Sequence, residues 1–130
     1  MPGTNAVLAG DATVSTALES ALNERGVKTS FHAAEGLARA LVSLERELED
    51  GRPDAAVAVG TGEAALALAV TASKLGVPLA AAVADTDGAG DDRRRILTTL
   101  ASLDAGSDPE RAADLIVAWL AQGPPATDLD

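Results

Sequence analysis

The chain has 130 residues, of which 47% are hydrophobic and only 2% aromatic, and it carries a formal net charge of −10. This length and apolar content predict one folded domain whose core is filled by alanine, valine and leucine. The acidity argues against binding to nucleic acid or to an anionic membrane. The absence of cysteine excludes disulfides, thiolate nucleophiles and cysteine-ligated zinc.

The start of the chain lacks the basic and apolar regions of a signal peptide. The long apolar stretch 55–84 is interrupted by Glu63, Lys74 and Pro78, so it does not predict a membrane span. We therefore expect a cytoplasmic protein in which residues 1–122 form the domain and 123–130 a disordered tail.

Strand-like and helix-like segments alternate along the chain. In chain order, we expect a strand at 5–9, a helix at 13–25, a strand at 27–32, a helix at 34–49, a strand at 55–59, a helix at 62–75, a strand at 79–84, and helices at 91–103 and 109–122.

Local signals support these bounds. Asp11 or Thr13 can cap the first helix, and Gly26 is placed to end it. The strand at 27–32 is more polar than the others, which suits the edge of a sheet. The strand at 55–59 is apolar at every position, as expected of a central parallel strand that is covered on both faces.

The last helix begins with a capping box formed by Ser107 and Glu110, and Pro109 belongs in its first turn. The segment 104–108 before it is short and polar, so we expect no fifth strand there.

This alternation predicts a three-layer α/β/α domain of the flavodoxin-like or half-Rossmann type, with about five helices and a four-stranded parallel sheet in the order 2-1-3-4. In that sheet the apolar strand 79–84 would be an uncovered edge, and the helix 62–75 is apolar almost all round. Both features lead us to expect a homodimer or an obligate protein partner.

Ligands of open parallel sheets bind at the carboxyl ends of the strands where the strand order reverses. Here that point lies between the first and third strands, and glycines there let a ligand approach the backbone and the start of a helix. The same glycines could equally serve only a tight strand-to-helix turn, since the pattern is not a complete phosphate loop. The predicted ligand-binding residues are Gly10, Asp11, Thr13, Gly60, Thr61, Gly62, Glu63 and Asp85.

Asp11 and Asp85 both follow central strands, and paired carboxylates there could hold Mg²⁺. The aspartates around residues 85–92 lack the register of a calcium loop, so we predict no metal site and interpret them as turn and capping residues. His32 is the only histidine, and we expect it at the sheet edge with no partner that the sequence indicates.

The segment 53–85, PDAAVAVGTGEAALALAVTASKLGVPLAAAVAD, resembles a βαβ unit of UDP-N-acetylglucosamine 2-epimerases and related GT-B glycosyltransferases. The likeness lies in a Pro-Asp pair, an apolar strand, a glycine turn, an alanine-rich helix and a Gly-Val-Pro strand entry. Residues 107–122 resemble the closing helix of these enzymes. The resemblance implies an N-terminal-type Rossmann-like half and a nucleotide-sugar or nucleoside ligand.

A weaker resemblance is to response-regulator receiver domains, through the Val-Leu-Ala-Gly-Asp opening and the Arg52-Pro53-Asp54 segment. Their phosphoacceptor aspartate would fall at or near Gly60, which implies a receiver that cannot be phosphorylated in the usual way.

We predict a non-catalytic flavodoxin-like domain that acts as an assembly subunit and binds a small anionic ligand at the switch point. The alternative is an enzyme or binding protein for a nucleotide sugar or nucleoside, in which Asp11, Glu63 and Asp85 serve as acid, base or ligand contacts. The lack of a nucleophilic cysteine, a partnered histidine and a complete phosphate motif favours the first. No cofactor is indicated.

Overall fold

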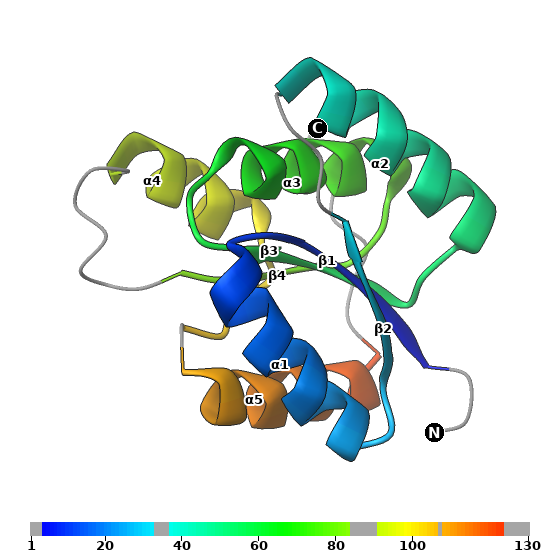
Figure 1. Ribbon diagram of the computed structural model, residues 1–130, viewed down its shortest axis with the longest axis vertical. Coiled ribbons are helices and arrows are strands. Elements are labelled where there is room, and N and C mark those ends of the chain that lie inside the picture. The colour runs from blue at the N-terminus through cyan, green and yellow to red at the C-terminus, as the bar shows by residue number, and fades with distance from the viewer. Residues whose placement is uncertain (1–3, 33–36, 84–90, 107, 124–130) are drawn as a thin grey trace.

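The computed structural model describes residues 4–32, 37–83, 91–106 and 108–123. These residues form one α/β domain in which strands and helices alternate (Figure 1). The elements are β1 (Asn5–Gly10), α1 (Ala12–Glu24), β2 (Lys28–His32), α2 (Leu37–Gly51), β3 (Ala55–Val59), α3 (Glu63–Leu75), β4 (Leu79–Ala82), α4 (Asp91–Leu100), β5 (Leu103–Asp104) and α5 (Pro109–Ala121).

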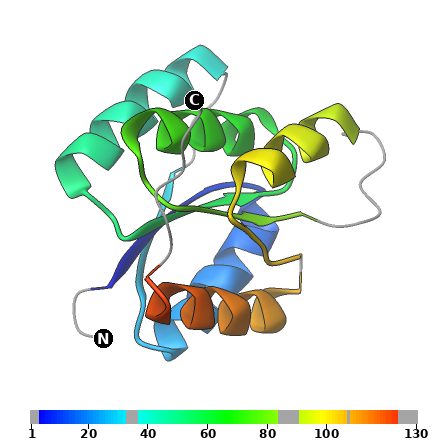
Figure 2. The ribbon, with the colours of Figure 1, turned by 180° about the vertical axis from the view of Figure 1, so that it is seen from behind.

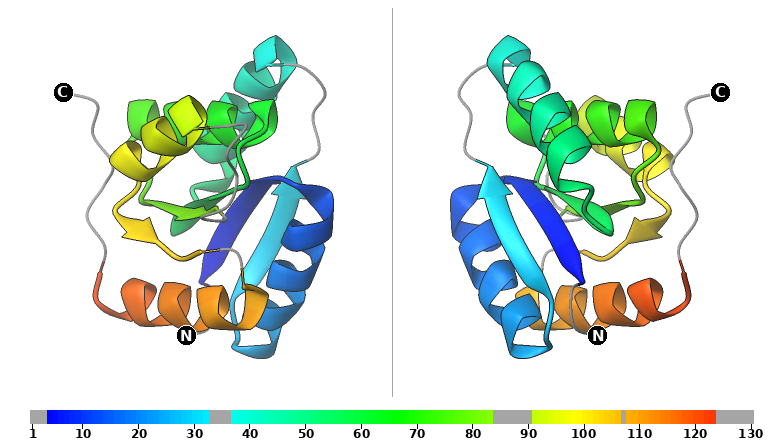
Figure 3. Two further views of the ribbon diagram at one scale, coloured as in Figure 1. Left: turned by 90° about the vertical axis from the view of Figure 1, so that its left-hand side faces the viewer. Right: turned by 90° about the vertical axis from the view of Figure 1, so that its right-hand side faces the viewer.

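The strands form one parallel sheet in the order β2-β1-β3-β4-β5, with β2 at one edge (Figure 3). Helices α2, α3 and α4 cover one face of this sheet, and α1 and α5 cover the other (Figures 1 and 2). The predicted three layers and the predicted order of the first four strands are therefore confirmed.

The prediction of four strands is wrong, because β5 extends the sheet beyond β4. Backbone bonds suffice for this pairing: Ser102 N and Ala105 N donate to carbonyls of β4 residues at 2.9 and 2.7 Å. Leu103 is partly buried and Ala105 is buried, and both pack with α5, so even a short polar segment contributes apolar side chains. The same pairing ends α4 at Leu100, three residues earlier than expected.

The core consists of two layers of small apolar side chains, one on each face of the sheet. Every residue of β3 is buried, as its uninterrupted apolar sequence predicts. Four of the seven buried residues of α3 are alanine, which allows this helix to pack closely on β1 and β3.

Both features that predicted a partner have an explanation within the chain. The strand β4 lies between β3 and β5, and α3 lies between α2 and α4 with the sheet beneath it (Figure 2). The homodimer remains a prediction, but these two features no longer support it.

Several predictions fall on residues outside the described ranges. These are the start of the second helix at 34–36, the loop that contains Asp85, the capping residue Ser107 and the tail at 124–130. Pro109 lies in the first turn of α5, as predicted. Within the described ranges, no helix has the length and apolar character needed to cross a membrane.

Candidate functional site

A pocket of about 380 Å³ lies at the carboxyl edge of the sheet, where β1 and β3 end. Asp11 N donates to Val59 O at 3.0 Å and Gly60 N to Ala82 O at 2.9 Å, and these bonds fix the two loops side by side. The pocket is lined by Gly10, Asp11, Gly60, Thr61, Gly62, Glu63 and Ala64. Six of the eight predicted ligand-binding residues therefore line one cavity. Thr13 is exposed on α1, and Asp85 lies outside the described residues.

Gly10 is required by the fold itself. Its φ is +136°, and a Cβ at this position would lie 1.8 Å from Val59 O. Any side chain would therefore collide with the neighbouring strand. Gly60 has a φ of +77°, which turns the chain from β3 toward α3.

The helix α3 points its N-terminus at this pocket. Gly62 is the N-cap residue and offers no side chain to the first-turn N–H groups, which lack partners within a helix. In contrast, Asp11 caps α1 by accepting a hydrogen bond from Val14 N at 2.9 Å. An anion in the pocket would therefore face the first-turn N–H groups of α3, which the N-cap residue Gly62 does not cap, and the positive end of the helix dipole.

The side-chain charge of the described lining residues disfavours an anion, so only the N-terminus of α3 would attract one. Asp11 and Glu63 contribute carboxylates, and the lining contains no lysine or arginine. Asp11 is engaged with the start of α1. Glu63 lies in the first turn of α3, where its carboxylate would repel a bound anion and compete with it for the N–H groups of that turn.

A second pocket of about 320 Å³ lies at the same edge, between the ends of β4 and β5 and the start of α5. Arg111 supplies a cation there, and Asp108, the N-cap of α5, makes no side-chain capping bond. This pocket was missed from the sequence because it depends on β5. Its lining residues are Val83, Asp104, Ala105, Gly106, Asp108, Arg111 and Leu115.

His32 lies at the predicted edge strand, but it has a partner that the sequence did not indicate. Its Nδ1 lies 2.6 Å from Oε2 of Glu47 on α2, and Ser30 Oγ donates to the other carboxylate oxygen at 3.0 Å. The side chains of His32 and Glu47 are 21% and 31% exposed.

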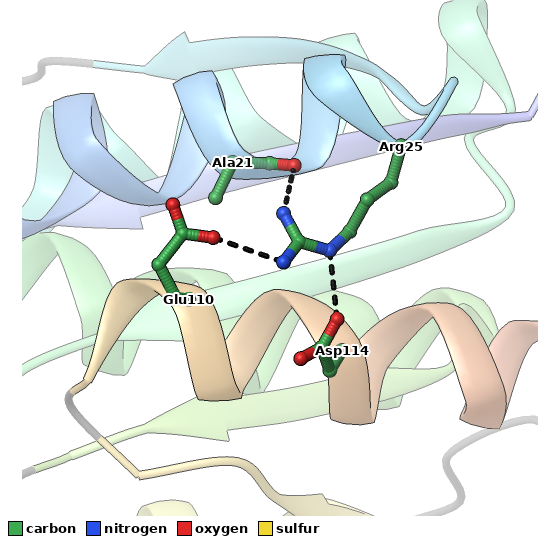
Figure 4. Close-up of polar contacts among 4 residues, drawn as sticks. All are labelled: Ala21, Arg25, Glu110 and Asp114. Atoms are coloured by element: carbon green, nitrogen blue, oxygen red, sulfur yellow. Dashed lines mark hydrogen bonds and ion pairs between the residues drawn. The ribbon is translucent and has the colours of Figure 1, made fainter.

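Arg25 belongs to the scaffold. Its guanidinium joins the end of α1 to α5 through Asp114 at 2.8 Å and Glu110 at 2.9 Å, and it also donates to Ala21 O (Figure 4). The hydrogen bond to Asp114, then that to Glu110, and the negative charges of both carboxylates raise the pKa of Arg25 above its ordinary value. These contacts connect α1 and α5, the two helices that cover the same face of the sheet.

No protein-family model and no curated protein matches this sequence. Among solved structures, the fold is similar to the S. aureus MnaA–UDP co-structure, with a TM-score of 0.67 and 15% identity over 91% of this chain. It is also similar to UDP-GlcNAc 2-epimerase from Methanocaldococcus jannaschii, with a TM-score of 0.62 and 16% identity over 88% of this chain. The enzyme from Neisseria meningitidis bound to UDP-GlcNAc gives a TM-score of 0.62 and 11% identity over 88% of this chain.

The chain covers only 42 to 43% of the length of these proteins. It is therefore a Rossmann-like α/β unit of the size of one half of a GT-B-like protein. More narrowly, its fold is that of a half of UDP-GlcNAc 2-epimerases, which confirms the predicted resemblance at the level of the fold.

Proposed function

We propose that this chain binds a nucleotide sugar of the UDP-linked class at the carboxyl edge of its sheet. The observation that supports this most is the pocket at the strand switch point, into which the N-terminus of α3 opens without a side-chain cap. Two of the proteins that share the fold were solved with UDP or UDP-GlcNAc.

In this proposal the diphosphate lies against the first turn of α3, where Gly60 and Gly62 leave the backbone accessible. The carboxylates of Asp11 and Glu63 are hydrogen-bond acceptors, so they suit sugar hydroxyls rather than phosphate. The second pocket lies two strands further along the edge, about 10 Å away at the usual strand spacing. A nucleotide sugar is long enough to reach it, and Arg111 would meet its far end there.

This proposal takes the place of the assembly role predicted first. The proteins of similar fold favour a nucleotide-sugar ligand. The two features that suggested a protein partner, the apolar strand β4 and the apolar helix α3, are covered by other elements of the same chain. Because the chain spans less than half of those neighbours, the proposal concerns ligand binding by this unit and assigns no reaction to it.

The experiment is a titration of the full chain with UDP and with UDP-GlcNAc by calorimetry, using wild type and Gly62→Asp. Gly62 has an ordinary φ of −73°, and a Cβ there meets no atom within 4 Å, so the substitution fits the backbone. An aspartate at the N-cap would take up the free N–H groups of α3 and repel a phosphate. We expect affinity to fall about tenfold or more while the free energy of unfolding changes by only a few tenths of a kcal/mol.

Gly51→Asp is the matched control. It adds the same charge at the amino edge of the sheet, at the end of α2, and a Cβ there also meets no atom within 4 Å. Its affinity should equal that of wild type. Failure of wild type to bind either ligand at millimolar concentration would refute the proposal, and equal weakening by both variants would move the site away from α3.

A further inference from the structure

The pair His32–Glu47 is a third feature of the carboxyl edge that could contact a ligand, besides the two pockets. Glu47 holds the ring with one carboxylate oxygen and accepts from Ser30 with the other, so the carboxylate is fixed from two positions of one strand. The proton of the neutral ring is assigned to Nδ1, because two acceptors at 2.6 Å would repel each other. Nε2 is then left as a hydrogen-bond acceptor.

The ring lies at the same edge of the sheet as the switch-point pocket, outside the residues that line it. His32 is in register with Ala9 of β1, and Gly10 and Asp11, which line the pocket, follow Ala9 directly. Ala9 packs in the core layer beneath α2 and α3, and register partners on parallel strands share a face. The imidazole therefore projects on the face on which α3 begins, at two strand spacings, or about 10 Å, from the end of β3.

Few charges face the ring from the described elements packed around it. Glu47 is the acidic residue of α2 that contacts the ring, and Ser43, one turn before it, is uncharged. On β1 the residues in register with Ser30 and His32 are Val7 and Ala9, which are apolar. Lys28 lies two residues before Ser30 and lines the same small cavity as Glu47, on the side away from the carboxyl edge.

We propose that His32, oriented by Glu47, is a specificity-determining residue whose Nε2 accepts a hydrogen bond from a hydroxyl of the nucleotide sugar. This inference rests on the proposed function, since it places His32 beside the same ligand. A carboxylate-held imidazole is a rigid acceptor for one donor direction. It therefore favours a ligand that carries a hydroxyl at that place over one that lacks it.

The competing explanation is that the pair only ties α2 to the edge strand, and two substitutions separate the roles. The amide nitrogen of an asparagine takes roughly the place of Nδ1, so His32→Asn keeps a donor to Glu47 and removes the acceptor at Nε2. The longer side chain in His32→Gln carries an amide oxygen to the place of Nε2 and restores that acceptor.

Affinity for UDP-GlcNAc is measured by calorimetry on the full chain. His32→Asn should bind about tenfold more weakly than wild type, with unchanged unfolding in urea. His32→Gln should recover most of the affinity.

Nitrogen NMR of the ring adds a readout that needs no assignment, because the chain has one histidine. The free protein should show the Nδ1–H tautomer, and UDP-GlcNAc should shift the Nε2 resonance. A neutral ring with its proton on Nε2, or unchanged affinity in His32→Asn, would each overturn this inference. If Gly62→Asp weakens binding and His32→Asn does not, only the role of His32 is refuted. If the wild type binds no ligand, both the proposed function and this inference are refuted.

Discussion

Replacing Gly10 by alanine tests the junction on which both the fold and the candidate site depend. Gly10 ends β1 with a φ of +136°, and a Cβ would lie 1.8 Å from Val59 O and 2.7 Å from the carbon of that carbonyl. Both are strand backbone atoms, so no flexible side chain can yield. Either β1 or β3 must move.

Three costs add in this variant. A non-glycine residue at such a backbone conformation costs about 1 to 3 kcal/mol. Relief of the collision by backbone movement costs about 1 to 3 kcal/mol more. The movement also weakens the bond from Asp11 N to Val59 O, which is worth about 1 kcal/mol. We therefore expect Gly10→Ala to lower the free energy of unfolding by about 3 to 7 kcal/mol, a large part of the total of about 5 to 15 kcal/mol for a domain.

The assay is equilibrium unfolding in urea, followed by far-ultraviolet circular dichroism and by the fluorescence of Trp119, the only tryptophan, which is buried in α5. Gly51→Ala is the control, because a Cβ there meets no atom within 4 Å and alanine favours a helix end. Its stability should be unchanged or slightly raised. A Gly10→Ala protein within about 1 kcal/mol of wild type would show that the junction of β1 and β3 is not built as described.

Two further substitutions test the scaffold. Ser15→Ala should raise the free energy of unfolding by about 1 kcal/mol, because Ser15 Oγ is fully buried with no hydrogen-bond partner among the described residues; a loss of stability in urea would reveal a hidden partner such as a buried water. Arg25→Met should lower the melting temperature more at low salt than at high salt, since it removes the ion pairs to Glu110 and Asp114. Arg111→Met removes an exposed arginine of α5 that has no ion pair among the described residues, so it should not lower the melting temperature in this salt-dependent way. Equal shifts of the melting temperature in the two variants would contradict the role of Arg25.

The sequence was sufficient to predict most of the fold because the strands and helices carry strong local signals. The uninterrupted apolar run of β3 indicated a central strand, and Asp11 caps α1 as its position before the helix suggested. The strand β5 carries no such signal. It has two residues, and its pairing comes from backbone groups that any sequence presents.

The candidate site was predictable only where it follows from topology. The turn glycines and Glu63 were found because the switch point of a parallel sheet is a fixed place. The pair His32–Glu47 was not, because it joins an edge strand to a helix and no spacing along the chain marks such a contact. Gly10 has in addition a structural role that was not predicted, since its missing side chain leaves room for Val59 O.

The helix termini at the carboxyl edge explain how an acidic chain could hold a phosphate-bearing ligand. The N-terminus of α1 is neutralised by Asp11, whereas α3 and α5 have no side-chain capping bond. Each of these two termini opens on one of the two pockets, and Arg111 lines the second. Positive potential from helix ends falls off within a turn, so it can attract a phosphate locally while the distributed acidic surface keeps the net charge at −10. A ligand that bridges both pockets would use both termini, and this is why a single carboxylate introduced at Gly62 should weaken binding when the same charge at Gly51 does not.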